Sequence, residues 1–98
     1  MATANPAAVL KLAGVLDAAA AAPLRASLLE LRGHDLCLDA AAVERAGTFC
    51  LQVLLAAAAS WKADGLALWV ASASRVFGEA TEVLGIGSQQ LRTEPSAP

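Results

Sequence analysis

Residues able to carry chemistry are few in this chain and widely spaced. Thr48 and Cys50 open the longest apolar stretch, and His34 is the only histidine. A cysteine nucleophile with a histidine base is the catalytic pairing that these residue types offer, and a helix N-terminus would favour the thiolate. A strand expected between His34 and Asp39 spans roughly 16 Å, so His34 should lie at the opposite end of the sheet from Cys50. We expect no catalytic residues and no enzymatic activity.

Metal ligands are equally sparse. Asp17, Asp39 and Asp64 fall one to each expected loop, without Asp-x-Asp spacing. Two cysteines and one histidine cannot complete the four ligands of a structural zinc site without carboxylates, and the aspartates are accounted for as helix caps and turn residues. We expect no metal and no cofactor, with Cys37 and Cys50 reduced and buried.

The composition of the chain argues against several further classes of protein. Of the 98 residues, 25 are Ala and 16 are Leu, and the mean hydropathy is +0.56. The longest charge-free stretch, between Arg45 and Lys62, has 16 residues, short of the roughly 18 that a membrane span needs. A secretory signal has a basic cluster followed by an apolar run, and residues 1–8 show no such pattern. A net charge of −2 and a pI of 5.2 disfavour nucleic acid as a partner. We expect a cytoplasmic protein without membrane insertion.

Short apolar runs alternate with helical patterns along the chain. Strands are predicted within 8–16, 36–38 and 66–70, and helices over 17–32, 48–63 and from Ser72 or Ser74 to Leu84. This order predicts an α/β fold with parallel neighbouring strands and helices packed on the sheet. The spacing in the last helix predicts a buried face formed by Val76, Phe77, Ala80, Val83 and Leu84. Residues 1–7 and 88–98 are expected to be flexible ends of a domain spanning 8–87.

The segment from Leu38 to Leu55 resembles the central signature of the STAS domain, the family of bacterial anti-sigma factor antagonists. Leu38 and Asp39 match the end of a strand, Val43 matches a hydrophobic position, and apolar residues after Cys50 match the following helix. Flanking matches are Leu12, Gly14, Leu16-Asp17, Asp64-Gly65 and Val83-Leu84-Gly85. The resemblance covers about residues 8–87 and implies a single STAS-like domain with a mixed four- to five-stranded sheet.

The chain departs from the family pattern where Asp-Ser-Ser-Gly is replaced by Gly47-Thr48-Phe49-Cys50. The run from Gly47 to Leu54, followed by Trp61, is closest to the short free-standing STAS proteins of bacterial chemotaxis gene clusters. By resemblance, Thr48 stands at the hydroxyl that partner kinases phosphorylate, although the preceding acid is missing. Thr48 is also predicted to be a simple N-cap of the helix that follows, and both interpretations remain open.

The helix face opposite the predicted core stripe is unusually apolar. It carries Phe49, Gln52, Val53, Ala56, Ala57 and Ser60, with no charge before Lys62. Such a face is either sandwiched within the domain or is a protein interface. The family resemblance implies partner binding through Asp39, Val43, Gly47, Thr48, Phe49 and Gln52.

These observations favour a non-catalytic protein-protein interaction module of bacterial signalling. The resemblance implies a kinase-like anti-sigma factor or a chemotaxis signalling protein as the partner. An alternative is an accessory STAS subunit of a phospholipid-trafficking ABC transporter, which also has Thr at the position of Thr48. In that group the preceding residue is acidic, whereas here it is Gly47.

Overall fold

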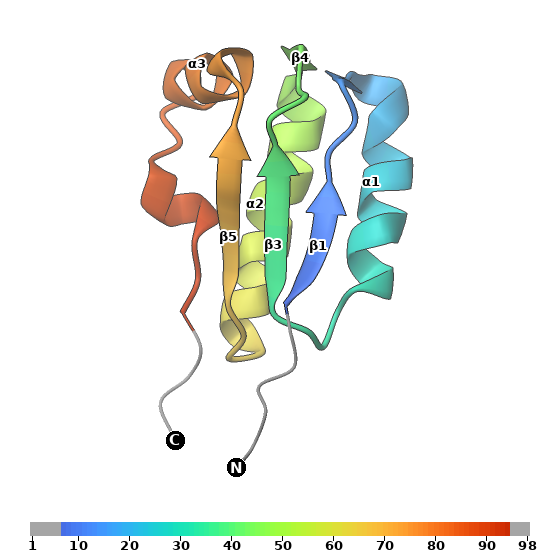
Figure 1. The fold of residues 1–98 in the computed structure, drawn as a ribbon, viewed down its shortest axis with the longest axis vertical. Helices are drawn as coiled ribbons and strands as arrows, with labels where there is room; N and C mark the ends of the chain where they lie inside the picture. Colours follow the sequence, from blue (N-terminus) through green and yellow to red (C-terminus); the bar gives the residue numbers. More distant parts are fainter. Residues whose placement is uncertain (1–6, 95–98) are drawn as a thin grey trace.

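Three parallel strands form the main sheet, in the order β1–β3–β5 (Figure 1). The structure is a computed structural model, and it describes residues 7–94. The strands are β1 (Ala8–Lys11), β3 (Leu36–Ala40) and β5 (Leu68–Ala73). A second, two-stranded parallel sheet pairs β2 (Val15–Leu16) with β4 (Arg45–Ala46). The α/β fold is therefore confirmed, with five strands divided between two sheets rather than joined in one mixed sheet.

Two helices cover one face of the main sheet (Figure 1). Helix α1 (Ala18–Glu30) begins where Asp17 Oδ1 accepts a hydrogen bond from the Ala20 amide at 3.1 Å, as predicted for an N-cap. Just beyond it, Gly33 has a φ of +94°, a conformation that glycine adopts without strain. Helix α2 (Thr48–Ala63) matches the predicted range 48–63. Among the described residues, no helix is long and apolar enough to cross a membrane.

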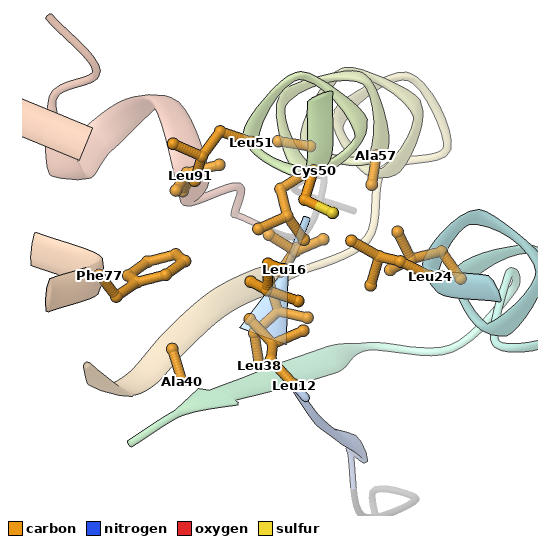
Figure 2. Close-up of a cluster of buried hydrophobic side chains, with 14 of the residues drawn as sticks. Leu12, Leu16, Leu24, Leu38, Ala40, Cys50, Leu51, Ala57, Phe77 and Leu91 are labelled. Atoms are coloured by element: carbon orange, nitrogen blue, oxygen red, sulfur yellow. The ribbon is translucent and has the colours of Figure 1, made fainter. Parts of the chain in front are cut away.

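The core lies between these helices and the main sheet (Figure 2). Alternate residues of β3 and β5 turn toward the helices, and Leu36, Leu38 and Leu68 have no exposed surface. From α2, Trp61 fills the core at 1 % exposure. Its indole Nε1 donates to the His34 carbonyl oxygen at 2.7 Å, so the largest buried side chain has its polar atom satisfied.

The predicted buried face of the last helix is wrong in part. Helix α3 (Arg75–Val83) is capped by Ser74, one of the two predicted residues. Phe77 is buried at 3 % exposure, but Val76, Val83 and Leu84 are 41 %, 84 % and 43 % exposed. These side chains are exposed because α3 lies across the carboxyl end of β5 rather than along the sheet (Figure 1). Only a narrow side of the helix therefore packs against the core.

The ordered domain extends past the predicted boundary at residue 87. A short 3₁₀ helix, η1 (Ser88–Leu91), brings Leu91 into the core at 4 % exposure. Thr93 then forms an antiparallel bridge with Leu68 at the edge of β5, and its hydroxyl donates to the Leu66 carbonyl oxygen at 2.6 Å. A few anchored side chains hold this segment without any helical or strand periodicity. The other residues predicted to be flexible, 1–6 and 95–98, lie outside the described residues.

Candidate functional site

The loop between β3 and α2 is held tightly at the carboxyl end of the main sheet. Half-buried Asp39 accepts a hydrogen bond at Oδ1 from the Ala41 amide at 3.0 Å, which turns the chain out of β3. The Ser74 hydroxyl donates to the Val43 carbonyl oxygen at 2.6 Å, and the Ser74 amide donates to the Ala40 carbonyl oxygen at 3.0 Å. This loop is therefore fastened to the start of α3.

Strands β2 and β4 hold the second half of the same loop. The Gly14 carbonyl oxygen accepts from the amides of Glu44 and Arg45 at 2.7 and 3.1 Å, and the Gly47 amide donates to the Leu16 carbonyl oxygen at 2.8 Å. A Cβ placed on Gly47 would lie 3.1 Å from that Leu16 oxygen. The absence of a side chain at Gly47 thus permits a close approach to β2.

Helix α2 begins one residue earlier than it would if Thr48 were its N-cap. Gly47 is the N-cap and Thr48 is the first helical residue, so the predicted capping role of Thr48 is wrong. No side chain caps the helix start, and the Thr48 hydroxyl, on an exposed residue, forms no hydrogen bond with the residues that the structure describes. The first helical hydrogen bond of α2 is donated by the Leu51 amide to the Gly47 carbonyl oxygen at 3.2 Å. The backbone amides before Leu51 in α2 therefore have no helical partner.

Cys50 is buried and cannot serve as the reactive thiol considered above. It has no exposed surface, and its Sγ donates to the Asp17 carbonyl oxygen at 3.3 Å. Burial first, and the nearby Asp17 charge second, raise the pKa of the Cys50 thiol, opposite to the lowering that a helix N-terminus alone would cause. Exposed His34 precedes β3, whereas Cys50 follows the carboxyl end of that strand. The two residues lie at opposite ends of the sheet.

The predicted docking residues separate into exposed and buried members. Thr48, Phe49 and Gln52 are exposed on the first turns of α2, and the exposed fraction of Phe49 is 64 %. Val43 is only 2 % exposed and packs in the core, so its side chain supports the loop and offers no contact surface. Asp39 and Gly47 are half-buried and shape the backbone beneath the exposed residues.

A groove between α1 and α2 continues the exposed apolar surface, and the sequence did not indicate its α1 side. Its volume is about 490 Å³. Phe49, Val53 and Ala56 line it from α2, facing Leu28 and Leu29 of α1. The face of α2 opposite the sheet is therefore neither fully sandwiched nor fully exposed, because α1 covers one side of it.

The charged residues of the groove are both arginines. Arg25 and Arg32 line it, and the Nε and Nη2 atoms of Arg32 donate to the two carboxylate oxygens of Asp64 at 3.1 and 3.3 Å. That ion pair joins the end of α1 to the end of α2. Among residues 7–94, no three His, Cys, Asp or Glu side chains gather in a group that could hold a metal ion.

One protein-family model matches the chain. It is described as "Mlab, STAS domain" and matches residues 1–93. At the level searched, no curated protein and no solved structure matches the chain. The match includes β1 to η1 and the loop that precedes Thr48, so the chain belongs to the STAS domain family.

Proposed function

We propose that this STAS domain is a non-catalytic, cytoplasmic interaction module of bacterial signalling, of the anti-sigma factor antagonist or chemotaxis-associated kind. The observation that carries the proposal is Phe49, a large apolar side chain that is 64 % exposed one residue after the family's hydroxyl position. An exposed aromatic beside an apolar groove is the arrangement expected of a binding hot spot. The partner proposed is a kinase-like anti-sigma factor or a chemotaxis signalling protein.

The surface around Phe49 suits a partner that buries apolar area. Thr48 and Gln52 are neutral, and the groove beyond them is lined by Val53, Ala56 and Leu29. Beneath this surface, the hydrogen bonds of Gly14, Gly47 and Ser74 hold the loop in place. A preformed surface loses little conformational entropy on binding, which favours docking without a large rearrangement of the domain.

Phosphorylation of Thr48 is a proposed switch for this surface. Its exposed hydroxyl lies at the positive end of the α2 dipole, where a phosphate finds free amides. A phosphate adds roughly 1.5 to 2 negative charges beside neutral Thr48, Phe49 and Gln52. A docked apolar partner supplies no cation to match that charge, so phosphorylation should release it.

The docking proposal is tested by Phe49→Asp. The tagged chain is used to capture partners from a lysate of its native bacterium, and the bound proteins are identified by mass spectrometry. Losing a buried aromatic contact of about 2 kcal/mol or more lowers affinity roughly 30-fold, so capture should be lost while circular dichroism is unchanged. Val83→Asp, at an 84 % exposed position on α3, is the matched control and should retain capture. Equal capture by wild type and Phe49→Asp would overturn the proposal.

The switch is tested separately. Thr48→Asp should reduce capture and Thr48→Ala should preserve it, because only the first adds charge. Intact-mass measurement of the chain isolated from its native cell should show a phosphate-sized addition that Thr48→Ala lacks. Repeated absence of that addition under several growth conditions would identify a constitutive adaptor instead.

The accessory transporter subunit remains the second candidate, because the resemblance places Thr at this position in that group too. The same capture experiment separates the two functions. An ABC-type ATPase retained by wild type and lost in Phe49→Asp would support the transporter role, whereas a kinase-like or chemotaxis protein would support signalling. Gly47 departs from the acid of the transporter group and of the antagonist pattern alike, so it favours only the chemotaxis-associated kind of signalling protein over the transporter subunit.

A further inference from the structure

The face of the main sheet turned away from α1 and α2 is not covered by any element of residues 7–94 (Figure 1). Leu36, Leu38 and Leu68 point to the helices, so the residues that alternate with them point to the open face. On that face Val9, Cys37 and Trp69 are direct register partners across β1, β3 and β5. Val9 is 65 % exposed, and Cys37 and Trp69 are half-buried. Together they form an apolar row across the whole sheet.

A bare face is unusual for a sheet of this kind. Sheets whose strands are all parallel occur almost entirely with both faces covered, and the pairs β1–β3 and β3–β5 are both parallel. A face kept in water would be expected to carry polar side chains along this row. The apolar row of Val9, Cys37 and Trp69 therefore indicates a surface that another layer covers.

The charges beside the row favour a second copy of this chain as that layer. One step further along the strands, Lys11 and Asp39 are register partners, and neither forms an ion pair with the described residues. Asp35, one residue before β3, alternates onto the same face, and its Oδ1 accepts a hydrogen bond from the Ala67 amide at 3.0 Å. Arg92 and Glu94 flank the face at the edge of β5 and pair with each other at 3.0 Å. Lys11 and Asp39 are thus a cation and an anion on this face without an ion-pair partner among the described residues. In a two-fold arrangement of these faces, each Lys11 can pair with the partner copy's Asp39. A strongly acidic or basic partner has no such match here.

We propose that the chain forms a two-fold symmetric dimer through these open sheet faces, with Cys37 of the central strand close to the axis. The patch is small, because strand spacing of about 4.8 Å and a rise of about 3.3 Å per residue give a face only ~15 Å on a side. Standard interfaces bury roughly 800 Å² on each partner. The dimer should therefore be reversible and depend on concentration. The Phe49 surface lies on the opposite side of the domain and stays free.

Sedimentation velocity over a concentration series tests the dimer. The wild-type chain should shift from its 9.9 kDa monomer mass to twice that mass as its concentration approaches about 1 mM. Val9→Asp should raise the dimer dissociation constant at least about tenfold, since both copies then place a charge in the apolar row. Val9→Thr keeps the branched shape and should weaken the dimer less. Phe49→Asp is the matched control and should dimerise as wild type does.

The two cysteines add a test of geometry. A short bismaleimide should link two chains through Cys37 at concentrations where the dimer forms, and Cys37→Ser should abolish the link. Buried Cys50 is the internal control that stays unlinked. A single 9.9 kDa species up to about 1 mM, or a dimer unaffected by Val9→Asp, would overturn the proposal. Loss of the dimer in Phe49→Asp alone would assign self-association to the α1–α2 groove instead. Partner capture should be unchanged in Val9→Asp, so the docking and dimer proposals fail independently.

Discussion

Replacing Ser74 by alanine should lower the free energy of unfolding by about 2 kcal/mol. The Ser74 hydroxyl makes two bonds at once: it accepts from the Phe77 amide at 3.1 Å and donates to the Val43 carbonyl oxygen at 2.6 Å. Losing an N-cap costs typically about 1 kcal/mol, and leaving a partly buried carbonyl without its partner costs about 1 kcal/mol more. For a domain of this size, the melting temperature should then fall by roughly 8–16 °C.

Urea unfolding followed by circular dichroism measures this loss, and two further variants divide it. Ser74→Asp keeps an acceptor for the Phe77 amide but has no hydroxyl to donate to Val43, so its stability should be intermediate. Ser72→Ala removes a neighbouring exposed hydroxyl that makes no hydrogen bond with the described residues, and it should stay within about 0.5 kcal/mol of wild type. If Ser74→Ala is as stable as Ser72→Ala, the proposed anchoring of the loop by α3 is refuted.

Two other predictions concern buried side chains. Trp61→Phe should destabilise the fold by roughly 1–3 kcal/mol in urea unfolding, because the His34 carbonyl oxygen loses its indole donor at 2.7 Å; an unchanged midpoint would contradict that role. Thiol labelling at pH 8 should modify half-exposed Cys37 well before Cys50, because burial both shields Cys50 and raises its pKa. Both thiols should label together in denaturant, and fast native labelling of Cys50 in Cys37→Ser would contradict its burial.

Elements with many residues and a clear period could be predicted from the sequence. Helix α2 has sixteen residues with apolar positions at helical spacing, and α1 has a capping Asp17 before it and Gly33 after it. In contrast, β4 has two residues, too few to show any alternation. Its strand geometry comes from pairing with β2, a contact between segments 30 positions apart in register, which local patterns do not encode.

For the candidate site, the sequence could predict the place of the proposed docking residues along the chain but not which of their side chains are exposed. The position of Thr48 and Phe49 at the start of a helix follows from the apolar pattern after them. Which of the proposed docking residues are exposed does not follow, because the Val43 side chain packs in the core and its carbonyl oxygen is held by Ser74, 31 positions away. The same limit applies to α3. The spacing of its apolar residues predicts which of them share a face of the helix. Val83 is nevertheless 84 % exposed, because the helix lies across the end of β5.

Gly47 shows how packing and chemistry compete at one position of the loop. By resemblance to the family pattern, it stands where an acid would precede the hydroxyl residue. In the fold, its amide donates to the Leu16 carbonyl oxygen at 2.8 Å, and a Cβ would lie 3.1 Å from that same oxygen. The glycine permits the close approach of β2 and β4 and places no acid immediately before Thr48. In the proposed switch the negative charge is therefore added at Thr48 itself, and before modification the exposed side chains of Thr48, Phe49 and Gln52 present a neutral surface to the proposed apolar partner.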